Sequence, residues 1–312
     1  MTHSAPANQT TLTASVIIPT VNRTAEVTAC LHSLCRQSQL PLEVLIVDAS
    51  GDDALEQHLA RTFPAPPFDL IVLASPPSTT SQRNLGARQA RGQVLVFLDD
   101  DVVLEESFLA EMLRPFAEQL LPNLGGLAGR ITNISPPSWR NRLLSQVFGL
   151  SEPGDGRYKK SGFPTHRFLH PNQSQVVPVD NVPSGVAAFR REVFDRVQFD
   201  ERMSGYAYME DDDFSLRVAK MFRLAYTPFA RLQHLETPTA RGNPRRRARQ
   251  RVRCYGYYFR KNWPRSPSHL AAHYRALAGL AAAGLFSRRG DGWQKFLGAM
   301  EGIADVLRGD IP

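Results

Sequence analysis

The sequence predicts an α/β fold: a doubly wound, mostly parallel sheet with helices on both faces, followed by a C-terminal helical extension. Three observations support this class. Short apolar, β-branched runs alternate with helix-like stretches over residues 15–98, polar residues follow several of these runs, and residues 239–309 carry a helical pattern throughout. Strands that alternate with helices are typical of parallel sheets, because each crossover helix returns the chain to the same edge.

Four strands alternate with helices in the first part of the chain. We expect the strands at residues 15–19, 42–47, 69–73 and 94–98. We expect the helices through Val27, Leu31 and Leu34 and at residues 55–63 and 80–90. The run at 94–98 consists of apolar residues alone, as is typical of a buried strand.

The second part of the chain is less regular. Residues 134–180 contain six prolines and few periodic apolar positions, so we expect a long loop over the sheet there. The elements expected next are a strand at 182–189, a short helix at 191–196, a helix at about 211–222 and short strands at 224–227 and 231–234. Residues 239–309 should be helical, with breaks at Pro264 and Gly290.

Composition excludes several classes of protein. The chain has 312 residues, of which 42% are hydrophobic and 21% charged, so it is neither disordered nor collagen-like. Its three cysteines, Cys30, Cys35 and Cys254, are too few and too scattered for a disulfide framework, which favours a reducing compartment. Residues 1–14 lack the pattern of a secretory signal, and residues 270–286 are too short and too interrupted to span a bilayer. We therefore expect a cytoplasmic protein.

The net charge of +7 is concentrated in residues 241–265, which contain ten basic residues and no acidic one. Such a cluster favours an anionic partner, for example phosphate, a lipid headgroup or nucleic acid. The same segment is rich in aromatic residues: Tyr255, Tyr257, Tyr258, Phe259 and Trp263. This mixture suits a membrane interface, and we expect weak peripheral association with the inner, anionic face of the membrane. Helical packing with the arginines left in solvent is the alternative.

Polar residues mark the ends of three predicted strands. Thr20 and Asn22 follow the first strand, Asp48 follows the second, and an aspartate triplet follows the fourth. In doubly wound sheets, ligands bind at the carboxyl ends of the strands, so we expect a site there. Residues 19–23 contain no glycine, which argues against a nicotinamide-binding unit and against a P-loop.

The aspartate triplet is suited to a divalent cation. Three adjacent carboxylates repel one another unless a cation or solvent relieves them, and oxygen ligands are those that hard cations prefer. In an extended chain, alternation places Asp99 and Asp101 on one side and Asp100 on the other, so one pair could chelate. An exposed acidic turn is the alternative.

A second acidic cluster, residues 210–213, begins the helix expected at 211–222. Acidic residues stabilise a helix N-terminus, yet four in a row exceed what capping needs. One of them could act as a general base toward an incoming hydroxyl. Arg217 should form a structural pair with Asp213, four residues before it. His234 ends a short strand and is either a hydrogen-bonded structural residue or a metal ligand.

Several segments resemble, in order and spacing, the family 2 glycosyltransferases with the GT-A fold. The resemblance covers about residues 14–235. The segments are SVIIPTVNR at 15–23, EVLIVDASG at 43–51, RNLGA at 83–87, GQVLVFLDDD at 92–101, FRREVF at 189–194, FDE at 199–201, EDDDFSLR at 210–217 and PFARLQH at 228–234. This chain departs from the family pattern at Val21, where an aromatic residue is usual, and at Ala49, where a second acid is common.

The resemblance implies a role for each position already singled out. A nucleotide-sugar donor linked to UDP, dTDP or GDP would be bound by Pro19, Thr20, Asn22, Asp48, Arg83, Asp99 and Asp100. The ligands of Mn²⁺ or Mg²⁺ would be Asp99, Asp101 and His234. The catalytic base would be Asp211, with Asp213 left as the alternative, and the acceptor and donor sugar would be bordered by Ser184, Gly185 and Glu210.

The function expected from the resemblance is metal-dependent, inverting transfer of a sugar to an acceptor hydroxyl. The acceptor would be a glycan or a lipid-linked molecule in cell-envelope, polysaccharide or glycolipid synthesis, with no nucleic acid as partner. We expect a disordered tail at 1–13, a GT-A domain at 14–238 and a helical extension at 239–312. Within that domain, residues 14–133 would bind the nucleotide and residues 134–238 the acceptor. The alternatives are a nucleotidyltransferase, or a non-catalytic protein of the same fold that binds nucleic acid or glycan and uses residues 241–265.

Overall fold

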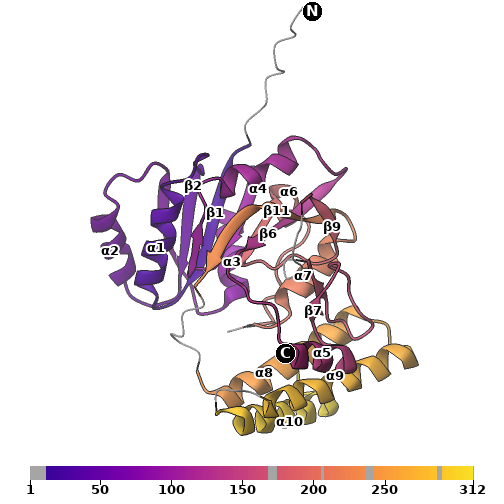
Figure 1. Ribbon diagram of the computed structural model, residues 1–312. Helices are drawn as coiled ribbons and strands as arrows, with labels where there is room; N and C mark the ends of the chain where they lie inside the picture. Colours follow the sequence, from indigo (N-terminus) through magenta and orange to yellow (C-terminus); the bar gives the residue numbers. More distant parts are fainter. Residues whose placement is uncertain (1–11, 168–173, 205–206, 236–241, 287–289, 312) are drawn as a thin grey trace, which may run out of the picture.

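The computed structural model describes residues 12–311 apart from 168–173, 205–206, 236–241 and 287–289. Its centre is a mixed sheet with helices on both faces, and a layer of helices lies below that sheet in the view of Figure 1. The described strands of the sheet follow the order β3-β2-β1-β4-β10-β6-β11-β5, with β9 paired to β11. This architecture confirms the predicted α/β class with a C-terminal helical extension.

The first half of the sheet is parallel, as predicted. The strands are β1 (Ala14–Thr20), β2 (Glu43–Asp48), β3 (Asp69–Ala74) and β4 (Val94–Leu98). The connecting helices are α1 (Thr24–Leu34), α2 (Ala54–Thr62) and α3 (Thr79–Gln89). β1 lies between β2 and β4, and β3 pairs with β2. β1, β2 and β4 are buried almost throughout, because helices cover both faces of a parallel sheet.

Antiparallel strands complete the sheet. Its second half contains β5 (Val102–Leu104), β6 (Leu124–Ile131), β9 (Val177–Val179), β10 (Val186–Arg190) and β11 (Arg223–His234). β10 runs antiparallel to both β4 and β6, while β11 is parallel to β6 and antiparallel to β5. The pairing of β11 with β5 sets His234 in register with Val102, directly after the aspartate triplet.

The prediction of a loop over residues 134–180 was wrong in part. Besides β9, this region contains α5 (Trp139–Phe148) and the strand pair β7 (Glu152–Pro153) and β8 (Thr165–His166). α5 begins at Ser138, whose hydroxyl accepts a hydrogen bond from a backbone N–H of the first turn, and it ends at Gly149 in the left-handed conformation. Pro136 and Pro137 therefore precede the helix and do not interrupt it.

Several other boundaries differ from the prediction. The strands predicted at 224–227 and 231–234 form the single strand β11, whose register to β6 shifts between Tyr226 and Arg231. Pro228 lies within that shift and lacks the N–H that a regular ladder uses. The remaining helices of this part are α4 (Phe108–Ala117), for which we predicted no element, α6 (Arg191–Phe194) and α7 (Glu210–Val218), which is shorter than predicted.

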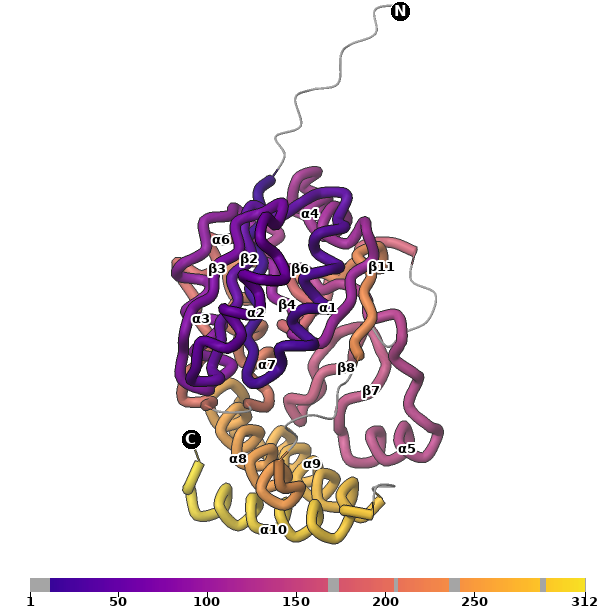
Figure 2. The backbone as a smooth tube through the Cα atoms, turned by 90° about the vertical axis from the view of Figure 1, so that its left-hand side faces the viewer, coloured from indigo at the N-terminus to yellow at the C-terminus, as the bar shows by residue number. Residues whose placement is uncertain are grey.

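The C-terminal extension is helical, as predicted. It consists of α8 (Pro244–Asn262), α9 (Pro267–Leu285) and α10 (Gly292–Arg308). Pro264 and Gly290 fall between these helices. Figure 2 shows the three helices stacked beneath the sheet. They share a hydrophobic core with the preceding part of the chain, where Phe163 stacks on Tyr255 with 4.7 Å between ring centroids.

The described part of segment 241–265 does not form the interfacial surface predicted for it. Its aromatic residues Tyr255, Tyr258 and Phe259 are buried in the core between the helices. Its cations are paired in several places, for example Arg249 Nε with the Asp305 carboxylate of α10 at 2.6 Å. The segment thus packs α8 against the rest of the protein through its aromatic residues, while Arg246, Arg251 and Arg260 remain exposed.

Most of the predicted disordered tail, residues 1–13, lies outside the described residues. Only Leu12 and Thr13 are described, next to β1. The Thr13 N–H donates to the side-chain oxygen of Gln93 at 3.1 Å, so the chain is fixed at the start of the sheet.

Candidate active site

Polar side chains gather at the carboxyl edge of the parallel strands. β1 and β2 end together, with Thr20 in register with Asp48, and Asp99 follows the last residue of β4. The first turn of α7 and the last residue of β11 reach the same edge, because Arg83 of α3 contacts Glu210 and His234 approaches Asp99. Residues that are far apart in the sequence therefore meet at one site.

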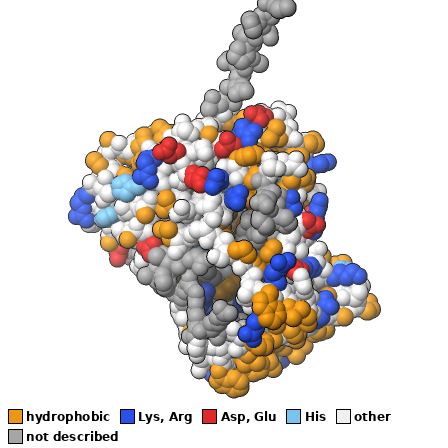
Figure 3. Space-filling view, in the orientation of Figure 1, with side chains coloured by type: hydrophobic (Ala, Val, Ile, Leu, Met, Phe, Trp, Pro, Cys, Tyr) orange, Lys and Arg blue, Asp and Glu red, His pale blue; other side chains and the backbone are white. Residues whose placement is uncertain are grey.

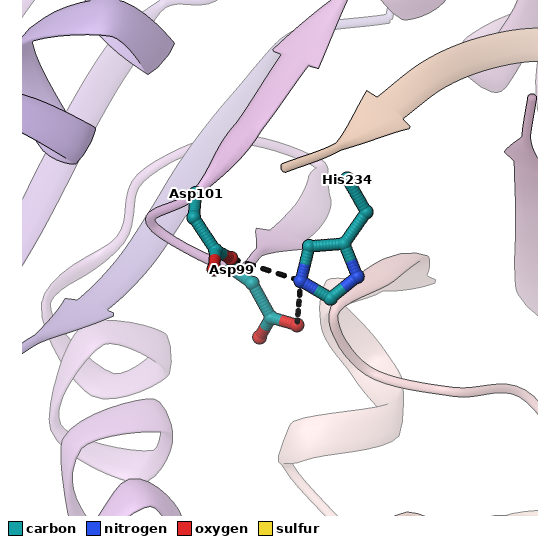
Figure 4. Close-up of side chains that lie close together, drawn as sticks. All are labelled: Asp99, Asp101 and His234. Carbon is teal, nitrogen blue, oxygen red and sulfur yellow. Dashed lines mark hydrogen bonds and ion pairs between the residues drawn. The ribbon is translucent and has the colours of Figure 1, made fainter. Parts of the chain in front are cut away.

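Asp99, Asp101 and His234 form a group that could hold a metal ion. His234 Nε2 lies 2.9 Å from Asp101 Oδ1 and 3.9 Å from Asp99 Oδ2. Figure 4 shows the imidazole turned toward both carboxylates. One potential ligand atom from each residue lies within 4.8 Å of the others. The two aspartates come from the turn after β4 and the histidine from the end of β11, so this group depends on the pairing of β11 with β5.

The chemistry of this donor set fits a hard divalent cation. Two carboxylates supply the anionic oxygens that Mg²⁺ and Mn²⁺ prefer, and an unprotonated imidazole adds a nitrogen that transition metals accept. The Asp99 side chain is 38% exposed, whereas that of Asp101 is 6% exposed. The group therefore has one side buried against the sheet and one side open to a ligand.

Asp100 is not part of this group, and it lies in a turn, not in the extended chain for which we predicted alternation. Its carboxylate accepts a hydrogen bond from the Thr20 hydroxyl at 2.8 Å and pairs with the Arg23 guanidinium. Burial raises the pKa of Asp100 to about 6, although Thr20 and Arg23 favour the ionised form. Arg23 also reaches Asp101 at 3.2 Å. Asp100 thus ties the turn after β4 to the end of β1.

Arg83 is the cation at the centre of the site. Its side chain is only 4% exposed, and its guanidinium lies 3.5 Å from Asp99, 3.2 Å from Glu210 and 3.4 Å from Asp211. It also lies over the ring of Phe199, 5.5 Å from the centroid. Burial and the negative charge of Asp211 raise the pKa of Glu210, while Arg83 opposes that shift. Arg83 therefore joins the turn after β4 to the first turn of α7.

Of the acidic residues at the start of α7, Asp211 faces the site and Asp213 does not. The Asp211 side chain is 28% exposed and accepts a hydrogen bond from the Ser184 hydroxyl. The Asp213 carboxylate is fully buried and is contacted by Arg217 at 2.7 Å and by Lys261 at 2.8 Å. The pair that we predicted between Asp213 and Arg217 is thus present, and Asp213 anchors α7 to α8.

We predict that Asp213→Asn destabilises the fold by about 2 kcal/mol, because Arg217 loses its charged partner and Lys261 keeps only Asp200. Urea unfolding of the full chain measures this change. Glu301→Gln is the matched control: its carboxylate pairs with Arg245 on the surface, so its loss should have little effect. Equal stability of both variants would contradict an anchoring role for Asp213.

Ser184 and Gly185 form the turn before β10, beside the carboxylates. The Asp99 N–H donates to the Gly185 carbonyl at 3.1 Å. A Cβ atom at position 185 would overlap the Asp99 carboxylate, so the glycine leaves room for that side chain. Ser184 is buried and holds Asp211. The two residues therefore border the space between the candidate metal ligands and Asp211.

The remaining predicted site residues lie at the ends of β1 and β2. Pro19 is in register with Val47. The Asp48 carboxylate accepts hydrogen bonds from the N–H of Ser50 at 2.9 Å and from its hydroxyl at 2.5 Å. The Asn22 N–H in turn donates to the Ser50 hydroxyl at 2.8 Å, with Asn22 in the left-handed conformation. These bonds fix the two loops that follow the strands.

Two residues to which we gave no role in the sequence contribute to this edge. Arg23 binds the aspartate triplet, and the Gln82 amide donates to the carbonyls of Thr20 at 2.9 Å and Val47 at 2.7 Å. Arg23 lies within the segment at 15–23 that carries the family resemblance, and its role could have been predicted from that segment. Nothing in the sequence pointed to a role for Gln82, because polar residues on a helix are usually exposed.

Comparison with known proteins gives a consistent result. A family model described as Glycosyl transferase family 2 matches residues 15–198. An uncharacterized glycosyltransferase of Haemophilus influenzae is 38% identical over 87 residues, which are 28% of this chain and 29% of that protein. The uncharacterized glycosyltransferase YwdF of Bacillus subtilis is 24% identical over 69% of this chain and 71% of the YwdF chain. The O-antigen biosynthesis protein RfbC of Myxococcus xanthus is 26% identical over 73% of this chain and 18% of its own.

Solved structures share the fold. The mannosyltransferase PcManGT from Pyrobaculum calidifontis, solved with GDP-Man and Mn²⁺, has a TM-score of 0.56 at 17% identity and covers 95% of this chain and 87% of its own. GalNAc-T7, solved with UDP, GalNAc and Mn²⁺, has a TM-score of 0.59 at 19% identity. The match covers 98% of this chain and 59% of the GalNAc-T7 chain. At such identities the likeness extends to the fold alone.

Proposed function

Because this chain belongs to glycosyl transferase family 2, we propose that it transfers a sugar from a nucleoside-diphosphate sugar to an acceptor hydroxyl, with inversion at the anomeric carbon. The observation that carries the proposal is the position of Arg83, which contacts both Asp99 and Asp211. The candidate metal ligands and the candidate base therefore border the same space. A donor sugar between them would have its diphosphate on one side and the attacking hydroxyl on the other.

The residues proposed to hold Mn²⁺ or Mg²⁺ are Asp99, Asp101 and His234. A bound divalent cation would neutralise the charge that develops on the departing nucleoside diphosphate. Two findings support these three residues as ligands: the geometry of their side chains, and the Mn²⁺ named for two structures of the same fold. Arg83 would add a second positive charge on this side of the site.

The donor nucleotide is proposed to lie over the ends of β1 and β2, in the half formed by residues 14–133. Its contacts would come from Pro19, Thr20, Asn22 and Asp48, with Arg83, Asp99 and Asp100 toward the diphosphate. The Asp48 and Asn22 loops are fixed through Ser50, which supports a preformed pocket. A preformed pocket lowers the entropy lost on binding.

Asp211 is proposed as the general base. In the transfer step the acceptor oxygen forms a bond to the anomeric carbon, the bond from that carbon to the diphosphate oxygen breaks, and the acceptor proton moves to the Asp211 carboxylate. Ser184 donates a hydrogen bond that orients this carboxylate, and the Arg83 guanidinium lies 3.4 Å from it. The acceptor would enter between Ser184, Gly185 and Glu210, in the half formed by residues 134–238.

The acceptor is proposed to be a glycan or a lipid-linked molecule of cell-envelope or polysaccharide synthesis, with the protein in the cytoplasm. One relative is named an O-antigen biosynthesis protein, which supports this class. A glycan acceptor presents hydroxyl groups of the kind that Asp211 would deprotonate.

The test is thermal unfolding with UDP-, dTDP- and GDP-sugars, each with and without Mn²⁺. A ligand at a hundredfold excess over its Kd should raise the Tm by about 5 °C, because only the folded protein binds it. We expect one nucleotide to give this shift in the presence of Mn²⁺ and a smaller shift without it. No shift with any donor in either condition would contradict the proposed donor site.

A further inference from the structure

The outer face of the C-terminal helices is apolar and exposed. On α10, the side chains of Trp293, Met300 and Leu307 are 61%, 46% and 65% exposed and follow one another at helical spacing. On α9, Tyr274 and Leu285 are about half exposed on the neighbouring ridge. In Figure 3 hydrophobic side chains gather along the lower edge of the molecule, over these helices. Monomeric proteins rarely expose a continuous apolar area of this kind without a binding role.

A groove of about 390 Å³ separates the two ridges, and its lining is almost entirely apolar. Its walls include Tyr274, Leu277 and Leu285 from α9 and Phe296, Met300 and Leu307 from α10. Trp293 stacks on Phe296, with 5.4 Å between ring centroids, and extends this surface toward the start of α10. The two acidic residues of α10 lie elsewhere: Glu301 pairs with Arg245 and Asp305 with Arg249, both of α8.

Cations lie on the other side of the α9 ridge. A second hollow, of about 670 Å³, is lined by Lys159, Lys160 and Arg275, and its one acid, Glu152, is paired with Lys159. α5 packs beside α9 here and exposes Trp139, Leu143 and Val147. The same helix carries Arg140 and Arg142 in exposed positions. Within the described chain, no acidic group forms an ion pair with Lys160, Arg275 or these two arginines.

We propose that this face, formed by α5, α9 and α10, binds the surface of a membrane that contains anionic phospholipids. The apolar ridges would enter the acyl boundary, and the cations beside them would meet the lipid phosphates. Trp139, Tyr274 and Trp293 are of the residue types that favour the headgroup level. None of the described helices has the length and apolar character that a transmembrane span requires.

The charge pattern favours this occupant over a second copy of the chain. A copy would bring the same cations to the interface, while α5 and α9 contain no acidic residue and the two acids of α10 already pair with α8. Anionic lipids would neutralise these cations. The surface also differs from the one that the sequence suggested, because the aromatic residues of segment 241–265 are buried and those of α5, α9 and α10 are exposed. The inference stands apart from the proposed transferase function, although a lipid-linked acceptor would be consistent with both.

Flotation of the full chain with vesicles tests the proposal. We expect binding at low salt to vesicles of equal parts phosphatidylglycerol and phosphatidylcholine, at least tenfold weaker binding to phosphatidylcholine alone, and a loss of binding as salt rises. Arg140→Gln with Arg142→Gln should weaken binding by about 25-fold, at about fivefold for each cation. Tyr274→Ser with Trp293→Ser should weaken it to a similar extent, because apolar area is lost.

The matched controls are Arg61→Gln on α2 and Leu40→Ser, an exposed cation and an exposed apolar side chain away from this face, and both should bind vesicles as the unaltered chain does. Absence of flotation at low salt, or equal flotation with both vesicle types, would overturn the proposal. So would a dimer in light scattering that the Tyr274→Ser, Trp293→Ser variant loses, since the face would then join two copies. Stabilisation by nucleotide-sugars reports on the other site, so a failure here leaves that function untouched.

Discussion

Asp211→Asn is expected to lower the rate of sugar transfer by about 10³-fold while nucleotide-sugar binding stays intact. The amide has nearly the same size as the carboxylate and can still accept the hydrogen bond from Ser184. It cannot accept the acceptor proton, so general-base catalysis is lost, and that contribution is typically 10²–10⁴-fold. The measurements are kcat with a transferable donor and the Tm shift that the same donor produces.

Asp213→Asn is the control for this result. Asp213 lies two residues further along α7 but is fully buried against Lys261 and Arg217, out of reach of an acceptor. Its variant should lose stability and keep its turnover per folded molecule. Normal turnover of Asp211→Asn would remove Asp211 from the role of base. Loss of turnover in Asp213→Asn at unchanged stability would give that role to Asp213.

The strands and the acidic turn were predictable because their signals are local. β4 is a run of five apolar residues, and its burial fixes where the chain must leave the sheet. Alternation along an extended chain then separates Asp100 from Asp99 and Asp101 without knowledge of any other element. In the structure Asp100 is held by Thr20 and Arg23 and lies outside the Asp99, Asp101 and His234 group, but the chain turns here and Arg23 also contacts Asp101.

The position of Arg83 was not predictable from α3 alone. Gln82, Arg83 and Asn84 are consecutive polar residues on a helix and would be assigned to its surface, yet all three are buried. Three of their partners, Thr20, Glu210 and Glu201, lie between about 60 and 130 residues away in the chain. Burial of a polar side chain depends on such long-range partners, and the spacing of residues along a helix gives no information about them.

The surroundings of the charges in segment 241–265 were likewise not predictable from the segment alone. Counting charges within residues 241–265 gives a strongly cationic stretch, but the acids that neutralise part of it lie in α10 and just after it, more than fifty residues later. Conversely, the exposed apolar ridges of α9 and α10 look like ordinary core positions in sequence. Only the packing of α8 against α10 decides which face of each helix is covered.

Removal of the metal site is expected to have an effect as large as loss of the base. Treatment with a chelator should abolish transfer, and Mn²⁺ should restore it. Asp99→Asn should lower transfer by at least about 10²-fold, because one anionic ligand is lost while the shape of the side chain is retained. It should also reduce the Tm shift that donor and Mn²⁺ produce together, which Asp211→Asn does not.

This difference separates the two roles. Asp99 and Asp211 both contact Arg83, so either substitution also changes the environment of that guanidinium. A defect shared through Arg83 would impair donor binding in both variants. Loss of a metal ligand would impair donor binding only in Asp99→Asn, and a higher Mn²⁺ concentration would partly restore that binding. Asp69→Asn, an exposed acid on β3 that pairs with Arg91, should leave transfer and donor binding unchanged. Wild-type Mn²⁺ dependence in Asp99→Asn would contradict the metal site.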